Sequence, residues 1–279
     1  MKISDIMVKD VVYAELPTTR EDVLTALIKN RRTGMPVVDS DGKILGTITR
    51  KDIFQNPGEQ QVAVIMEWDV PTVSQNTSVE KAAAIMYEQD VRRLPVVNKE
   101  KMVGLVTPSD MLRVLVKKKT EGFVGDYVRT TTICLHKSTP INVAARIMNL
   151  GEVYAFPVLD DNASMCGIVT DRDLYDLNYL DESIMLTTLG ISEDEDSWTW
   201  EGIRNIMNLY YQEARIDLPK EPIEKFMSKD PKIIYDKAHV WKAAKEMRRG
   251  NFDQLPVVDN DDELKSMIYD MDLMKALMD

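Results

Sequence analysis

Four aspartates recur at matching places along this chain, and their spacing makes them the side chains best suited to do chemistry. Each closes a four-residue motif, which we call a tetrad. The tetrads are Thr49-Arg50-Lys51-Asp52, Thr107-Pro108-Ser109-Asp110, Thr170-Asp171-Arg172-Asp173 and Tyr269-Asp270-Met271-Asp272. An ionised carboxylate only accepts hydrogen bonds, so each Asp needs donors nearby. A Thr-x-x-Asp motif at a helix start supplies them, and such capping stabilises a helix by about 1 kcal/mol.

Capping alone does not account for the tetrads. A capping box favours Glu or Gln at its fourth position, whereas all four tetrads have Asp. The last tetrad keeps Asp272 although Tyr269 cannot cap as Thr does. A second role for the carboxylates is therefore open beside capping, and the two roles are compatible.

Other chemistry-bearing residues form no recognisable constellation. His136 and His239 are far apart and have no ligand-spaced partners, so we expect no metal site. Neither Cys134 nor Cys166 lies in a nucleophile motif, and no P-loop or Gly-rich dinucleotide fingerprint is present. We therefore expect a protein that is not an enzyme and that needs no obligatory cofactor.

Each tetrad belongs to a longer repeated pattern. A Pro-Val pair precedes it, with 13, 12, 13 and 13 residues from the Pro to the first tetrad residue. The pairs are Pro36-Val37, Pro95-Val96, Pro157-Val158 and Pro256-Val257. An anchor residue stands 29 residues before each Pro, and the anchors are Met7, Met66, Val128 and Met227. Self-similarity at a period near 60 indicates one supersecondary unit used four times.

The elements that must position the tetrads can be predicted from repeat one. Residues 11–13 are β-favouring, and residues 20–31 have apolar side chains at helical spacing. Residues 35–39 and 44–48 then form two strand-like runs around an Asp-Gly turn, a strong hairpin signal. A second helix starts at the tetrad. The order β-α-β-β-α places the chain in the α/β class, built from α+β repeat units.

The spacing of the repeats sets the domain boundaries. Successive Pro-Val pairs are 59, 62 and 99 residues apart, so an insertion separates the last two repeats. We expect repeats at 1–58, 59–119, 120–178 and 221–279, with the insertion at 179–220. A unit of this size is small for burying its own sheet and helices, so the repeats should pack in pairs.

The insertion has its own pattern. After the acidic run 191–197, residues 198–216 place apolar side chains on one helical face. This helix either folds over the second repeat pair or serves as a partner-docking or gating segment, and the sequence leaves both open.

Composition limits the partners. The chain has 279 residues, of which 44% are hydrophobic, and a formal net charge of −11. This charge argues against a nucleic-acid backbone or an anionic membrane as the main partner. No apolar run is long enough for a membrane span, the first residues lack the apolar core of a signal peptide, and two Cys make no disulfide framework. We expect a soluble cytoplasmic protein.

The repeated pattern resembles the cystathionine-β-synthase (CBS) domain family. Its units carry an anchor Met, a hydrophobic-Pro-Val strand and a Gly-hydrophobic-Thr/Ser-x-x-Asp run. Repeats one to three match the last run at 46–52, 104–110 and 167–173. The resemblance covers nearly the whole chain except the insertion. The architecture is similar to that of stand-alone archaeal and bacterial proteins with four CBS repeats and of the γ subunit of AMP-activated kinase. It implies two Bateman modules, each made of two paired repeats.

The resemblance also implies a ligand. In this family, the cleft between paired repeats binds adenosine-containing molecules such as AMP, ADP, ATP or S-adenosylmethionine, and the tetrad Asp holds the ribose hydroxyls. A carboxylate suits this role because it can accept from both vicinal hydroxyls. The implied ribose-binding residues are Asp52, Asp110, Asp173 and Asp272 with Thr49, Thr107 and Thr170.

Basic residues near the tetrads are the candidates for phosphate binding. Arg92 and Arg93 stand just before Pro95, positions from which basic residues reach phosphates in the kinase γ subunit. Arg50, Lys51 and Arg172 lie inside tetrads, where the N–H groups of a helix start also favour a phosphate. The alternative is that all five are ordinary surface charges.

Apolar residues before each Pro are the candidates for adenine contact: Met35, Leu94, Phe156 and Leu255. Such residues are more often plain core. Repeat four departs most from the pattern, since it lacks the tetrad Thr and the preceding Gly, and Asp253 would repel a phosphate.

The sequence thus predicts a regulatory sensor that binds an adenosyl ligand and signals to a protein partner, with a homodimer as its expected assembly. The alternative is a structural or dimerisation scaffold that uses the same modules without a physiological ligand.

Overall fold

The computed structural model describes residues 1–30, 32–56, 58–129, 131–151, 153, 155–170, 173 and 220–278. The predicted insertion helix at 198–216 lies outside the described residues, as does Arg172.

Repeat one has the predicted order of elements. A short helix η1 (Ile3–Asp5) leads into β1 (Ala14–Glu15), α1 (Arg20–Lys29), β2 (Gly34–Val38), β3 (Ile44–Thr49) and α2 (Arg50–Gln55). Strand β1 is parallel to β2, and β2 is antiparallel to β3. The first strand was predicted at residues 11–13 and forms at Ala14–Glu15 instead. Its position follows from pairing with β2, which strand propensity alone does not detect.

The other repeats follow the same plan. Repeat two contains α3 (Val62–Ile65), β4 (Glu67–Trp68), β5 (Val73–Ser74), α4 (Val79–Glu88), β6 (Leu94–Asn98), β7 (Lys101–Val106) and α5 (Pro108–Lys118). Repeat three contains η2 (Val124–Asp126), β8 (Leu135–His136), α6 (Ile141–Gly151), β9 (Ala155–Leu159) and β10 (Met165–Thr170). Repeat four contains η3 (Ile223–Lys225), β11 (Ile234–Tyr235), α10 (Val240–Gly250), β12 (Gln254–Val258), β13 (Leu264–Tyr269) and η4 (Asp272–Leu277).

The second helix of repeat four differs from the prediction. A helix was expected to start at the tetrad, but η4 is a 3-10 helix that begins only at Asp272. In repeats one and two the Thr of the tetrad is the N-cap of the second helix, whereas Tyr269 has no hydroxyl close to its backbone. The start of the helix therefore moves along the chain.

The first long helix of each repeat buries a short apolar stripe. In α4 the buried residues are Val79, Ala82, Ala83 and Met86, and in α10 they are Val240, Ala243, Ala244 and Met247. This i, i+3, i+4, i+7 spacing places the side chains on one face, and the two alanines let the helix backbone approach its neighbours closely.

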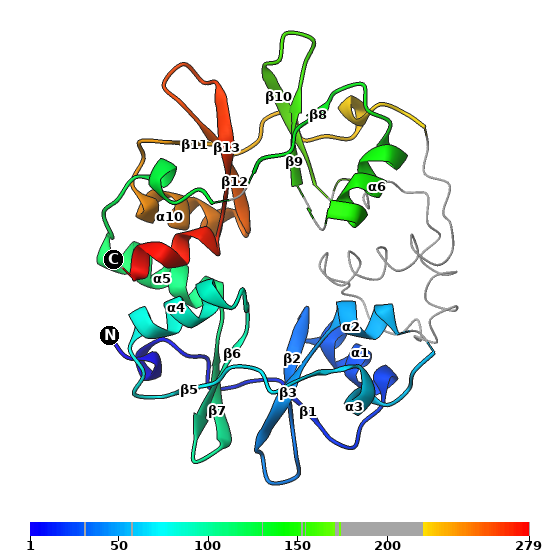
Figure 1. The fold of residues 1–279 in the computed structure, drawn as a ribbon, viewed down its shortest axis with the longest axis vertical. Coiled ribbons are helices and arrows are strands. Elements are labelled where there is room, and N and C mark those ends of the chain that lie inside the picture. The colour runs from blue at the N-terminus through cyan, green and yellow to red at the C-terminus, as the bar shows by residue number, and fades with distance from the viewer. Residues whose placement is uncertain are drawn as a thin grey trace.

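The four repeats form a ring (Figure 1). The sheets of repeats one and two lie next to each other, as do the sheets of repeats three and four. Helices of repeats two and four pack against one another, and one hydrophobic core joins these two repeats. A second core contains buried residues of repeats one and three.

Candidate functional site

Paired repeats exchange a short segment of chain at each anchor. The segment after Met7 crosses to repeat two, where Val8 and Leu105 exchange two backbone hydrogen bonds of 2.9 Å. The segment after Met227 crosses to repeat three, where Ser228 pairs with Ile168 at 2.9 and 3.0 Å. In the same way β4, which follows Met66, pairs with β3 of repeat one. Each tetrad thus lies beside chain contributed by its partner repeat.

The Gly before each complete tetrad makes room for this exchange. A Cβ on Gly104 would lie 2.8 Å from Met7 Sδ and from the Val8 carbonyl oxygen. A Cβ on Gly167 would meet Met227 Sδ and the Ser228 carbonyl oxygen at the same distance, and Gly46 has Met66 and Glu67 as its neighbours. Each glycine is therefore matched to an anchor Met of the partner repeat.

Repeat four lacks this Gly, and its matching anchor is not a Met. Strand pairing aligns Ser266 with the glycines, since Val257 pairs with Ser266 as Val37 pairs with Gly46. The matching anchor is Val128, the one anchor that is not Met. The segment after Val128 reaches repeat four through a side chain, with Met267 N donating to Thr132 Oγ1 at 2.8 Å.

Asp52 in repeat one is capped and half-buried. Its Oδ2 accepts from Thr49 N at 2.8 Å and from Thr49 Oγ1 at 2.6 Å, and its own N–H donates to Thr49 Oγ1 at 3.2 Å. Within the described ranges no donor contacts Asp52 Oδ1. One carboxylate oxygen thus completes the cap while the other is uncommitted.

Asp110 in repeat two has the same cap but an additional cation. Thr107 N and Oγ1 donate to its Oδ2 at 3.0 and 2.9 Å. Arg113 Nη2 donates to its Oδ1 at 2.9 Å and also to the Ile6 carbonyl oxygen at 2.8 Å. Both oxygens of this buried carboxylate are therefore engaged.

Asp173 in repeat three resembles Asp52 more closely. Thr170 N and Oγ1 each donate to its Oδ2 at 2.7 Å. Ser228 Oγ, from the segment exchanged by repeat four, donates to Oδ1 at 3.4 Å.

Asp272 in repeat four is 1% exposed and held by other means. Tyr269 N donates to its Oδ2, and Arg129 Nε donates to its Oδ1, both at 2.9 Å. Burial raises the pKa of this carboxyl, and the Tyr269 N–H and the Arg129 guanidinium offset the effect only in part. The neighbouring Asp270 is also buried and is bound by Arg92.

The predicted phosphate ligands do not converge on one place. Arg92 binds Asp270 of repeat four. Arg93 instead contacts repeat one, where its Nη2 donates to Thr33 Oγ1. The Arg93 side chain also lies against Gly34, so that a Cβ on this glycine would be 2.7 Å from the guanidinium carbon. Arg50 is fully buried and donates from Nη2 to the Leu27 carbonyl oxygen at 3.1 Å, and Lys51 is exposed. Their phosphate-binding roles stay predictions.

The predicted adenine contacts are all core residues. Met35 and Phe156 belong to the core shared by repeats one and three, and Leu94 and Leu255 to the core shared by repeats two and four. None is more than 1% exposed. Packing accounts for all four positions, and adenine contact stays a prediction.

The sequence did not single out Arg113, Arg129 or Ser228, although each donates to a tetrad Asp. A signal existed for two of them, because Arg129 and Ser228 directly follow an anchor, in the place of Val8 and Glu67. The exchange brings this position to the partner tetrad. Arg113 follows its Asp by one helical turn and gave no such signal.

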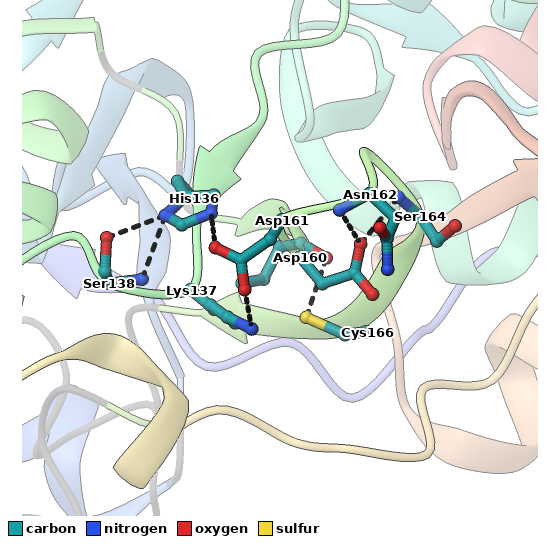
Figure 2. Close-up of polar contacts among 9 residues, drawn as sticks. His136, Lys137, Ser138, Asp160, Asp161, Asn162, Ser164 and Cys166 are labelled. Atoms are coloured by element: carbon teal, nitrogen blue, oxygen red, sulfur yellow. Dashed lines mark hydrogen bonds and ion pairs between the residues drawn. The ribbon is translucent and has the colours of Figure 1, made fainter.

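A polar cluster lies at the hairpin of repeat three, apart from the tetrad (Figure 2). Ser138 Oγ lies 2.7 Å from His136 Nδ1, and His136 Nε2 lies 3.3 Å from Asp161 Oδ1. Lys137 also pairs with Asp161, and its hydrogen bond lowers the pKa of that carboxyl. The Ser138 N–H donates to Nδ1 as well, so the contact closes a local turn. In repeat two, Ser74 and Thr77 close the equivalent turn.

No helix in the described part of the chain is both long and apolar enough to cross a membrane. Among the same residues, no group of three or more His, Cys, Asp or Glu side chains is arranged to hold a metal ion.

Comparison with solved structures shows the same architecture elsewhere. An uncharacterized conserved protein from Pyrococcus horikoshii is 26% identical, with a TM-score of 0.71 over 99% of this chain and all of that one. MJ1225 from Methanocaldococcus jannaschii is 22% identical in structure comparison, with a TM-score of 0.69 over 99% of each chain.

Comparison with curated sequences gives partial matches. MJ1225 is 24% identical over 190 residues, which cover 62% of this chain and 68% of that protein. MJ1404 from the same organism is 28% identical over 175 residues, and the match spans only 41% of its length.

A family model settles the classification. The model for the CBS domain matches residues 3–58, 62–117, 124–178 and 223–279. These four segments carry the four tetrads, the exchanged anchors and the paired sheets described above. The chain belongs to the CBS domain family, with four CBS domains paired as two Bateman modules.

Proposed function

We propose that this chain is a non-catalytic sensor that binds an adenosine-containing ligand between paired CBS repeats and signals its presence to a protein partner. The ligand class is AMP, ADP, ATP or S-adenosylmethionine. Family membership supports the proposal, and the geometry of Asp52 carries it.

Asp52 combines the two properties that a ribose clamp needs. Its Oδ2 is fixed by Thr49, so the carboxylate has a set orientation before any ligand arrives. Its Oδ1 has no donor among the described residues, and an oxygen of this kind can accept from two vicinal hydroxyls. The cap therefore prepares the clamp instead of competing with it.

Arg93 places a cation against repeat one. It belongs to repeat two and reaches Thr33 and Gly34 of repeat one, so it lies at the border of the paired repeats. A phosphate or other anionic group on the ligand would be attracted to this side chain. This arrangement favours the first Bateman module as the nucleotide site.

Signalling follows from the exchanged segments. Because the exchanged segments join paired repeats, a ligand that prefers one arrangement of the pair shifts the population toward it. A partner that binds the same arrangement more tightly then reports the ligand.

Isothermal titration of ligand-stripped protein with AMP, ATP and S-adenosylmethionine tests the proposal. We expect one of these ligands to bind, and Asp52→Ala to weaken its affinity about 10- to 100-fold, since hydrogen bonds to a charged group are lost. Asp41→Ala, at the exposed tip of the neighbouring hairpin, is the matched control and should bind as the unmodified protein does.

The scaffold alternative is favoured by one observation: arginines already occupy the carboxylates of Asp110 and Asp272. If none of the three ligands binds to the stripped protein, the scaffold becomes the better account and the sensor proposal fails.

A further inference from the structure

The tetrad of repeat four is engaged by arginines from two other repeats. Arg92 of repeat two forms a bidentate pair with Asp270, with Nη1 to Oδ1 at 2.9 Å and Nη2 to Oδ2 at 2.7 Å. It also approaches Asp253 at 3.6 Å. The Asp270 side chain is 4% exposed, whereas that of Arg92 is 45% exposed.

A second arginine engages the other carboxylate of the same tetrad. Arg129 of repeat three donates from Nε to Asp272 Oδ1 at 2.9 Å and from Nη2 to Asp90 Oδ1 at 3.0 Å. Its guanidinium carbon lies 4.8 Å from the centre of the Tyr87 ring, a cation–π distance. Asp90 and Tyr87 belong to repeat two.

Both links join the same two places. Asp90 and Arg92 lie in the short connection between α4 and β6 of repeat two, and Asp270 and Asp272 lie at the end of β13 in repeat four. Figure 1 shows η4, which begins at Asp272, beside α4 and α5 of repeat two. The two links therefore bridge the first Bateman module and the second.

We propose that the repeat-four tetrad is an ionic lock that holds the two Bateman modules together, in place of a ligand clamp. Asp270 is buried and bidentate with Arg92, so removal of the guanidinium would leave a buried carboxylate without its ion-pair partner. A sugar bound at Asp272 would have to displace Arg129 from Oδ1, and Asp90 would lose the same guanidinium. The local sequence agrees, because Tyr269 and Ser266 replace the Thr and Gly of the other tetrads.

The lock requires nothing of the proposed ligand, so it is tested on ligand-free full-length protein. Chemical unfolding is measured for Arg92→Met, Asp270→Asn and the double variant, with Lys118→Met as a matched control that breaks the half-exposed pair with Glu80. Arg92→Met is expected to raise the equilibrium constant for unfolding roughly 10- to 100-fold, because the native state loses the pair. Lys118→Met should raise it no more than about fivefold.

The double variant measures the coupling directly. If the lock exists, Arg92→Met has little added effect once Asp270 is uncharged, so the double variant resembles Asp270→Asn alone. The proposal is overturned if the double variant changes the equilibrium constant by the product of the two single effects. It is also overturned if Arg92→Met has no larger effect than Lys118→Met.

A second measurement holds even where Arg92→Met does not fold. Hydrogen exchange of Asp270→Asn should show faster exchange in α4 and η4 and unchanged exchange in β2 and β3 of repeat one. Equal rates in α4 and η4 of the variant and the unmodified protein would contradict a lock at this place.

Discussion

Each tetrad carboxylate has two oxygens, and the four repeats use them differently. The Oδ2 atom accepts the backbone N–H of the first tetrad residue in every repeat, which is Thr49, Thr107, Thr170 or Tyr269. Among the described residues, the Oδ1 atom has no donor in Asp52, contacts a hydroxyl in Asp173 and meets an arginine in Asp110 and Asp272. The capping interpretation of the sequence is thus confirmed for repeats one and two, while the ribose role of each Asp stays a prediction.

The sequence could predict the hydrogen bonds within each tetrad but not the arginine contacts from distant residues. The caps join residues three apart, so the motif itself contains both partners. Arg129 stands 143 residues from Asp272, and only folding shows that they meet. Arg92 was interpreted as a phosphate ligand from its place before Pro95, and its contact with Asp270 across 178 residues was equally hidden.

At Asp110, removal of the cation tests how much the engaged carboxylate depends on it. Arg113→Met leaves Asp110 Oδ1 without its donor and also removes the hydrogen bond to the Ile6 carbonyl oxygen. We expect a loss of about 1 kcal/mol in unfolding free energy, since Arg113 is itself half-exposed. Denaturant unfolding measures it, with Arg146→Met on the exposed side of α6 as control. Equal stability of the two variants would show that Asp110 does not depend on Arg113.

At the scale of elements, the hairpins were predictable because their turns are local. Gly42 has a φ of +77°, a conformation that L side chains rarely adopt, and Asp39 Oδ1 accepts from the Asp41 and Lys43 N–H groups at 2.9 Å. The Asp-Gly signal contains this information. Strand β4 gave no such signal, since it exists only through pairing with β3 of the partner repeat.

The exchanged segment predicts a strong effect of a small substitution. Gly104→Ala places a methyl group 2.8 Å from Met7 Sδ and from the Val8 carbonyl oxygen, so the segment must shift. We expect a loss of about 1–3 kcal/mol, the usual cost of overpacking, in denaturant unfolding. Gly58→Ala is the matched control because no atom lies within 4 Å of its new Cβ. If both variants unfold alike, close approach of the segment is not important for stability.

At the scale of the whole molecule, sheets and helices make different connections. The sequence predicted the pairs within each Bateman module, since repeats one and two adjoin without a linker. It did not predict that one core joins repeat two to four, where helices pack together, and that a separate core joins repeat one to three. The apolar helix stripes are nearly alike, so their pattern shows that they are buried but not against which repeat.

This arrangement separates the two kinds of tetrad. The arginine-bound carboxylates Asp110 and Asp272 belong to the repeats that share one core, and Asp52 belongs to a repeat that contributes to the other. We therefore expect ligand binding at the repeat-one tetrad, with the repeat-two and repeat-four side of the ring serving as the structural connection between modules.

A crystal structure of the protein with the tightest-binding adenosyl ligand tests the central claim most directly. The account predicts a ligand in the cleft of the first Bateman module, with its ribose hydroxyls within hydrogen-bond distance of Asp52 Oδ1 and the Arg92–Asp270 pair intact. A ligand bound at Asp272 with Arg129 displaced, or one whose ribose contacts none of the tetrad carboxylates, would contradict it.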